Sequence, residues 1–248
     1  MTVATDERAT LCFLHGWGFD YRVLGSFTER FVPEWKVKAL VLPGYDGTPP
    51  QAMGIGNIAR AMIPEVPDNS ILIGWSLGGM IGIRIAAMRP VRKLILLAST
   101  PCFVKKRDWP YGTDAEVIEG LKRRIKIDPG RALREFAMLI SGGDSRPRAT
   151  YQALVLLLQE NKAHADALLD GLDILLHADL RAEFSGLKCK ASVILAAQDP
   201  LVPVAAGSVM LSLHAGMESA VIYGAGHAPF MSRPEQTRQM LLAMVERI

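Results

Sequence analysis

Short apolar runs recur along the chain, and each of them predicts a buried β-strand. They are rich in leucine and β-branched residues and are apolar throughout, rather than alternating with polar positions. Stretches with apolar residues at helical spacing lie between several of these runs. Together they predict an α/β fold with a mostly parallel sheet, covered by helices on both faces. The six runs are "TLCFLHG" from Thr10, "VKALVLPG" from Val37, "SILIGWS" from Ser70, "KLILLAST" from Lys93, "ASVILAA" from Ala191 and "SAVIYG" from Ser219.

Three helices are predicted beside these runs. One precedes the second run, one follows the third run and ends at Pro90, and the last begins at Pro234. Their apolar positions are Val23, Leu24, Phe27 and Phe31; Met80, Ile81, Ile83, Ile85 and Met88; and Met240, Leu241, Met244, Val245 and Ile248.

About ninety residues between the fourth and fifth runs have helical patterns only. Because the sheet resumes afterwards, they predict a helical cap over the carboxyl ends of the strands, where open α/β sheets bind ligands. We therefore expect a core domain of residues 1–103 and 183–248, with a cap insertion of residues 104–182. The helical positions of the cap form four groups: Val117, Ile118, Leu121 and Ile125; Leu133, Phe136, Leu139 and Ile140; Tyr151, Leu154, Val155 and Leu158; and Leu168, Leu169, Leu172, Leu175 and Leu176.

Composition excludes several classes of protein. The chain has 248 residues, of which 50% are hydrophobic and 21% charged, so it can bury a sizeable core. It opens with "MTVATDERAT", which lacks the segments of a signal peptide, and no apolar run could span a membrane, so we expect a cytoplasmic protein. Cys12, Cys102 and Cys189 lie far apart, which indicates neither disulfides nor a zinc site. A net charge of +3 does not indicate binding to nucleic acid.

Candidate chemistry begins with Ser76. Gly74, Ser76 and Gly78 form a GxSxG pattern between an apolar strand and the start of a helix. A nucleophilic serine needs such a strand-to-helix turn, in which glycines on either side leave room for neighbouring backbone. The helix N-terminus behind the serine favours negative charge. We therefore interpret Ser76 as a nucleophile, the alternative being a structural serine in a tight turn.

A serine nucleophile needs a base, and the base needs an orienting acid. Asp199 follows the fifth apolar run in "AAQDPLVP", and His227 follows the sixth in "GAGHAPF", so both stand at strand carboxyl ends, as Ser76 does. The chain order Ser, Asp, His is the order found in α/β-hydrolases. The weaker candidates are Asp173, Asp179, His164 and His177 in the cap region, His214 near a helix end, and His15, which we interpret as structural.

The negative charge that develops on the substrate oxygen also needs donors. The turn "LHGWGFD" after the first strand could direct the backbone N–H of Trp17 at that oxygen, beside the N–H of Leu77, which follows the nucleophile. Trp17, Leu77, Trp75, Phe103 and Phe136 are our candidates for the substrate pocket.

Several motifs together resemble one family over nearly the whole chain. They are "LHGWG", "LPGYDGT", "IGWSLGG", "STPCF" followed by "DWPYG", "LLDGLDILLHADLR" and "GHAPFMSRPEQ". In these motifs the sequence is similar to the pimeloyl-acyl carrier protein methyl ester esterases of biotin synthesis, which have the α/β-hydrolase fold. The resemblance implies an enzyme that cleaves the methyl ester of a pimeloyl chain on acyl carrier protein, with a cap that shapes the acyl tunnel and binds the carrier.

The resemblance also implies a basic docking face on the cap. Residues 105–148 hold eleven Lys and Arg against seven Asp and Glu, whereas residues 149–182 hold two against five. A basic face would attract the strongly acidic carrier, although a solvated helix face is the alternative. Arg131 and Arg148 match two carrier-binding arginines of the family, and Arg134 and Arg146 lie close to two others that are not matched. Those unmatched positions hold Glu135 and Gln152.

Two further departures from the family leave the chemistry untouched. Only about ten residues precede the first strand, too few for the two antiparallel strands that commonly begin this fold, so we expect seven strands or fewer. The acid loop reads "AAQD" where the family usually has a glycine.

The sequence thus predicts a serine carboxylesterase, monomeric and without cofactor or metal, that forms an acyl-enzyme. Two alternatives remain. The same residues could serve another small ester, as in a general short-chain carboxylesterase or a lyase of the same fold. The chain could also be a hydrolase-like protein that binds a ligand without catalysis, which the intact set of Ser76, Asp199 and His227 disfavours.

Overall fold

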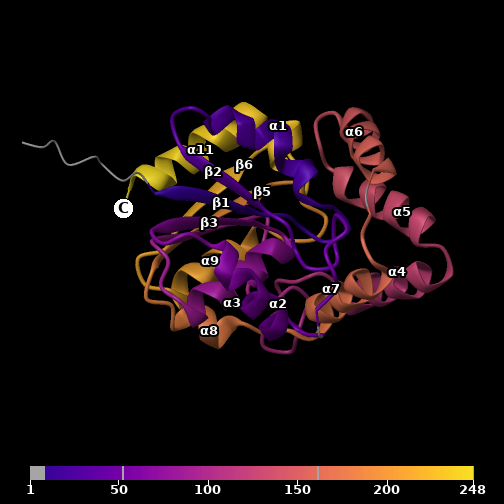
Figure 1. The fold of residues 1–248 in the computed structure, drawn as a ribbon, viewed down its shortest axis with the longest axis horizontal. Helices are drawn as coiled ribbons and strands as arrows, with labels where there is room; N and C mark the ends of the chain where they lie inside the picture. Colours follow the sequence, from indigo (N-terminus) through magenta and orange to yellow (C-terminus); the bar gives the residue numbers. More distant parts are fainter. Residues whose placement is uncertain (1–8, 52, 161, 248) are drawn as a thin grey trace, which may run out of the picture.

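The six predicted strands form one parallel sheet in the part of the chain that the structure describes, residues 9–51, 53–160 and 162–247. In this computed structural model the strand order is β2-β1-β3-β4-β5-β6 (Figure 1). The predicted α/β fold is confirmed. The strands are β1 (Thr10–Leu14), β2 (Lys36–Leu40), β3 (Ser70–Trp75), β4 (Lys93–Leu97), β5 (Lys190–Ala196) and β6 (Glu218–Ile222).

The order of the strands creates a crevice at one edge of the sheet. The chain leaves β1 for β2 on one side and returns to β3 on the other side, so the direction of winding reverses between β1 and β3. Every residue of the inner strands β3 and β4 is buried, because helices cover both faces. Loops after β1 and β3 therefore meet where open α/β sheets place their ligand sites.

Helices flank the sheet on both faces. In Figure 1, α1 and α11 lie on one face, and α2, α3, α8 and α9 lie on the other. The predicted helix around Val23 to Phe31 is divided into the 3₁₀ turn Tyr21–Leu24, α1 and the 3₁₀ turn Glu29–Phe31. Gly25 is the first residue of α1, directly after the first 3₁₀ turn. Glycine lowers the stability of a helix, which is consistent with the break at this position. The flanking helices are α1 (Gly25–Thr28), α2 (Ile55–Met62), α3 (Leu77–Met88), α8 (Arg181–Ser185), α9 (Ala205–Leu213), α10 (Pro229–Ser232) and α11 (Pro234–Glu246), and a further 3₁₀ turn is Ile63–Glu65.

Four helices between β4 and β5 form the segment that we call the cap, and Figure 1 shows them beyond one edge of the sheet. Each coincides with one of the four predicted groups of apolar positions. Helix α4 packs on α5 and α7, and α5 packs on α6. The cap helices are α4 (Ala115–Ile127), α5 (Pro129–Ser141), α6 (Pro147–Gln159) and α7 (Ala165–His177).

Within the described residues, no helix has both the length and the apolar character needed to cross a membrane. Cys12 and Cys102 are buried and Cys189 is half-buried, each as a free thiol.

Lys93 at the start of β4 ties the sheet to the last helix. Its side chain is 1% exposed, and its Nζ donates to the carbonyl of Met244 at 2.6 Å, in the final turn of α11. Glu218 lies 3.5 Å from the same nitrogen. Burial lowers the pKa of Lys93, and the nearby Glu218 opposes that shift. A cation at this position donates to a carbonyl at the C-terminus of the helix and interacts favourably with the helix dipole.

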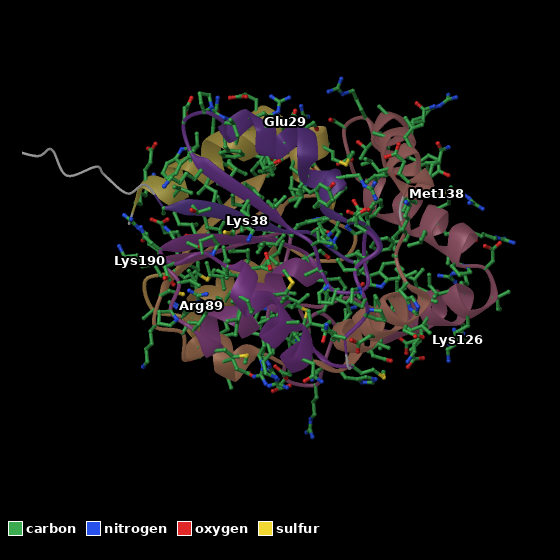
Figure 2. The ribbon with its side chains drawn as sticks, viewed as in Figure 1. Glu29, Lys38, Arg89, Lys126, Met138 and Lys190 are labelled. Atoms are coloured by element: carbon green, nitrogen blue, oxygen red, sulfur yellow. The ribbon has the colours of Figure 1, made fainter. Side chains whose placement is uncertain are left out.

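Lys93→Met keeps an unbranched side chain but leaves the Met244 carbonyl without its donor. We expect the free energy of unfolding in urea to fall by about 1–3 kcal/mol. Lys190→Met is the matched control, because Lys190 pairs with Lys93 across the adjacent strand yet is exposed (Figure 2). Equal effects of the two substitutions would contradict this account of Lys93.

Candidate active site

Ser76 occupies a strained turn between β3 and α3. Its backbone has φ 53° and ψ −122°, a region that residues with a side chain rarely adopt. Three hydrogen bonds hold the turn: its N–H donates to the Leu97 carbonyl at 3.1 Å, and its carbonyl accepts from the Ser99 hydroxyl at 2.7 Å and the Gly79 amide at 2.9 Å. The surrounding structure thus fixes a conformation that the serine alone would not hold.

The glycines beside Ser76 permit close approach of backbone. A Cβ added at Gly78 would lie 2.5 Å from the carbonyl oxygens of Leu14 and His15, at the end of β1. One added at Gly74 would overlap the backbone of Gly79 in the same turn. Any larger residue at either position would therefore displace the turn that carries Ser76.

Ser76, His227 and Asp199 form a chain of hydrogen bonds. His227 Nε2 lies 2.8 Å from Ser76 Oγ, and His227 Nδ1 lies 2.8 Å and 3.0 Å from the two carboxylate oxygens of Asp199. Asp199 Oδ1 also accepts the backbone N–H groups of Leu201 at 2.8 Å and Val202 at 3.1 Å. The side chains of His227 and Asp199 are fully buried and Ser76 is 3% exposed, so water screens these bonds weakly.

The weaker candidates for acid and base lie elsewhere. Asp173 pairs with Lys122, and Asp179 with Arg181 and Lys106, and the Arg181 pair lowers the pKa of Asp179 to about 2. Three of the other histidines lie at helix ends: His164 precedes α7, His177 is its last residue, and His214 follows α9.

The loop after β1 lies against the turn that carries Ser76. A Cβ added at Gly16 would lie 3.2 Å from Ser76 Cβ, which brings the neighbouring Trp17 close to the serine. The indole Nε1 of Trp17 donates to the Leu168 carbonyl in α7 at 2.7 Å. Leu77 is the first residue of α3, where amides have no partner within the helix. The two predicted donor residues therefore both lie near Ser76, the predicted nucleophile.

Gly171 in α7 lets the cap approach both predicted donor residues. A Cβ added there would lie 2.6 Å from Trp17 Cδ1 and 3.2 Å from Leu77 Cδ2. Its neighbour Asp170 accepts the backbone N–H of Gly54 at 2.9 Å. Helix α7 is therefore fixed to the core beside Leu77, the residue that follows Ser76.

Aromatic side chains surround the same place. The rings of Trp17 and Phe136 meet edge to face at 4.8 Å, and Phe19 lies 6.0 Å from Trp75 and 6.4 Å from Phe136. Sequence reasoning missed Phe19, although it lies only two residues after Trp17 in "HGWGF". The Trp75 indole donates to the His227 carbonyl at 2.8 Å, so this side chain helps to hold the predicted base in place.

Phe103 stands apart from that cluster. It is buried in the segment after β4, where its carbonyl accepts the Thr113 N–H at 2.9 Å. Among the described residues, no ring contact joins it to the other predicted pocket residues. Its role in a substrate pocket stays a prediction.

A groove of about 460 Å³ on the cap is lined by side chains of both α4 and α5. It reaches Leu201, whose amide binds the Asp199 carboxylate, and so approaches the site from the cap side. Apolar and charged side chains both contribute to its lining, among them Arg123, Arg124, Glu135, Phe136, Leu139 and Leu201.

The four arginines predicted for carrier docking are exposed on the cap. Arg131 and Arg134 lie on α5, while Arg146 and Arg148 lie at the start of α6. Glu135 neutralises part of this face, because it pairs with Arg131 at 2.9 Å and with Arg124 at 3.0 Å. Gln152, the second departure from the family, is exposed on α6.

Nothing in the described residues forms a group of three or more His, Cys, Asp and Glu side chains that could hold a metal ion.

His15 supports the loop after β1 from inside the core. It is fully buried, its Nδ1 donates to the Gly16 carbonyl at 3.0 Å, and its Nε2 accepts the Leu42 amide at 3.1 Å. Burial lowers the pKa of His15 to about 4. A neutral imidazole with both nitrogens engaged has a structural role, as the sequence predicted.

Comparison with known proteins places the chain in a family. The sequence model of the alpha/beta hydrolase family matches residues 13–240. A pimeloyl-[acyl-carrier protein] methyl ester esterase from Aromatoleum aromaticum is 34% identical over 237 residues, which cover 92% of this chain and 95% of the relative. One with the same name from Yersinia pseudotuberculosis is 32% identical over 240 residues, which cover 95% and 93%. The resemblance seen in the sequence motifs is thereby confirmed.

Solved structures agree on the fold. An esterase from Exiguobacterium antarcticum superposes with a TM-score of 0.85 at 22% identity, covering 96% of this chain and 92% of that one. A bromoperoxidase from Bacillus anthracis gives 0.83 at 18% identity, with the same coverage. The protein is a carboxylic ester hydrolase. The chain belongs to the alpha/beta hydrolase family.

The depressed pKa of His15 predicts a pH dependence of stability. Between about pH 6.5 and pH 4 the unfolded chain binds a proton at His15 that the folded protein does not, so stability falls as the pH is lowered. In urea titrations between pH 7 and pH 4, wild type should lose roughly 3 kcal/mol more than His15→Gln, which lacks this titration. Parallel pH profiles for the two proteins would contradict the prediction.

Proposed function

We propose that this protein hydrolyses the methyl ester of a pimeloyl chain carried on acyl carrier protein, through Ser76, His227 and Asp199 and an acyl-enzyme. The observation that carries the chemistry is the hydrogen-bonded chain from Ser76 Oγ through the His227 imidazole to Asp199. Support for the substrate comes from the names of relatives that match over almost their full length.

In the first half of the reaction, Ser76 Oγ attacks the ester carbonyl carbon while His227 Nε2 accepts the hydroxyl proton. Asp199 keeps Nδ1 protonated and stabilises the imidazolium that forms. The amides of Trp17 and Leu77 donate to the oxyanion. When the tetrahedral intermediate collapses, the carbon–oxygen bond to the methyl group's oxygen breaks, and His227 gives that oxygen its proton to release methanol.

In the second half, water replaces the serine. His227 removes a proton from a water molecule as it attacks the acyl-enzyme, and returns that proton to Ser76 Oγ when the acyl bond breaks. The products are the free carboxylate of the acyl chain and the regenerated hydroxyl. No cofactor takes part in this sequence.

The outer face of the cap supports binding of an acidic carrier. Arg146 and Arg148 stand at the N-terminus of α6, where the helix dipole disfavours cations, so helix stability does not explain them. Exposed apolar side chains accompany the basic ones: Met138 is 60% exposed on α5 (Figure 2) and Leu156 is 63% exposed on α6. A mixed basic and apolar face suits an acidic partner with an apolar surface.

Ser76→Ala tests the nucleophile. We expect the kcat for any ester to fall roughly 10⁴-fold, with the small residual rate due to binding and the oxyanion donors. A fluorophosphonate should label wild type at Ser76 and leave the variant unlabelled, as read by mass spectrometry of the peptide. Near-normal turnover by Ser76→Ala would end the proposal, and a wild type that resists labelling would favour a binding protein without catalysis.

The substrate is tested by kcat/KM for methyl pimeloyl-acyl carrier protein at low and high salt, beside a p-nitrophenyl short-chain ester. We expect preference for the carrier-bound ester, weakening at high salt because exposed charges guide the encounter. Replacing the four docking arginines, Arg131, Arg134, Arg146 and Arg148, with alanine should lower the carrier-bound value about tenfold and flatten its salt dependence.

The matched control removes four exposed cations near the amino ends of the strands, away from their carboxyl ends. They are Lys36, Arg92, Lys188 and Lys190. It should leave turnover of the carrier-bound ester unchanged. If the free ester is turned over equally well regardless of salt, the protein is a general short-chain carboxylesterase.

A further inference from the structure

We propose that Asp144, at the junction of α5 and α6 in the cap, is a positioning residue for the catalytic base His227. It acts through the backbone of Gly226. This inference rests on the proposed function, because it assigns a role relative to the proposed base.

Asp144 reaches out of the cap to the loop that carries His227. Its Oδ1 accepts the N–H of Gly226, the residue directly before the base, at 2.5 Å and across 82 positions of sequence. The residue is 7% exposed. A charged acceptor on a buried amide makes a strong hydrogen bond, so the position of Gly226 is set by the end of α5.

The next amide along the loop is held by the same part of the cap. The N–H of His227 donates to the Ile140 carbonyl at 3.2 Å, in the last turn of α5. Helix C-terminal carbonyls lack partners within the helix, and the catalytic loop satisfies this one. On the other side, the His227 carbonyl accepts the Trp75 indole N–H. The backbone of the base is thus fixed by one contact from the core and two from the cap.

The turn around Asp144 also contacts the loop of the acid. The Ser145 N–H donates to the Gly224 carbonyl at 3.1 Å, and Gly224 donates to the side chain of Gln198 at 2.7 Å, next to Asp199. A Cβ at Gly143 would overlap the Gln198 carbonyl, and Gly143 has φ +81°. One turn of the cap therefore packs on both loops that meet in the His227–Asp199 pair.

Stability alone is a poor explanation for a carboxylate at this position. Asp144 Oδ2 is buried and has no hydrogen-bond partner among the described residues. Desolvating a charged oxygen without a partner is unfavourable, and an apolar side chain would avoid that penalty. What the carboxylate provides is a fixed acceptor for the Gly226 N–H. This bond holds the His227 imidazole within hydrogen-bond reach of both Ser76 and Asp199. Small displacements of a catalytic group are known to slow reactions greatly.

Three variants separate this role from a structural one. Asp144→Ala removes the acceptor, Asp144→Asn keeps a side-chain oxygen for Gly226 N–H, and Asp128→Ala is the matched control. Asp128 caps the other end of α5, where its Oδ1 accepts the Arg131 N–H at 2.9 Å, far along the helix from Asp144. Active sites are counted by the amplitude of fluorophosphonate labelling at Ser76, so that rates refer to folded enzyme only.

For Asp144→Ala we expect kcat per labelled site to fall about tenfold or more, with KM for a p-nitrophenyl ester within about twofold of wild type. Asp144→Asn should restore kcat to within about threefold of wild type, and Asp128→Ala should lower only the thermal midpoint. The proton resonance of His227 Nδ1–H, which lies at low field in a bond to a carboxylate, should broaden in Asp144→Ala and be retained in Asp144→Asn.

An unchanged kcat per labelled site in Asp144→Ala, together with an unchanged Nδ1–H resonance, overturns the proposal. So does an equal loss in Asp144→Ala and Asp128→Ala. If Asp144→Ala yields no folded protein, Asp144→Leu, which fills the buried volume without an acceptor, is judged by the same two readouts. Failure of wild type to label at Ser76 would instead refute the proposed function.

Discussion

The arrangement of the whole site depends on one backbone constraint, the left-handed conformation of Ser76. A residue with a side chain holds such a conformation only where its surroundings leave no alternative. Here the surroundings are the end of β4, through Leu97 and Ser99, and two glycines that admit the backbone of β1 and of the turn itself. The parallel order of the strands brings these segments together, because their carboxyl ends share one edge of the sheet.

The cap completes the site. In α7, the Leu168 carbonyl accepts the Trp17 indole N–H, and Gly171 leaves room for the side chains of Trp17 and Leu77. The end of α5 holds the backbone of Gly226 and His227. The core supplies Ser76, Asp199 and His227, and the cap fixes the loops that carry two of the proposed roles, oxyanion donor and base. The outer face of α5 and α6 is left with exposed cations and apolar side chains.

Most of the fold could be predicted from local pattern. Runs without polar side chains, such as residues 71–75, predict buried parallel strands, because a strand covered on both faces has no solvent-facing positions. Each of Ser76, Asp199 and His227 comes shortly after such a run, so the sequence predicts that all three lie at the carboxyl ends of the strands. The break near Gly25 was missed, because apolar spacing alone does not distinguish one helix from a chain of short turns. The contact from Asp144 to Gly226 was also missed, since a single side chain that accepts a distant backbone N–H leaves no periodic trace in the sequence.

The turn at Gly142–Ser145 limits how freely the cap can be exchanged. An insertion that merely covered a finished core could be replaced by one from a relative with different acyl selectivity. In this chain such a transplant would remove the acceptor of the Gly226 amide and the Ile140 carbonyl that binds the His227 N–H. When caps are exchanged between esterases of this kind, the end of α5 and the loop that carries the histidine therefore have to come from the same parent protein.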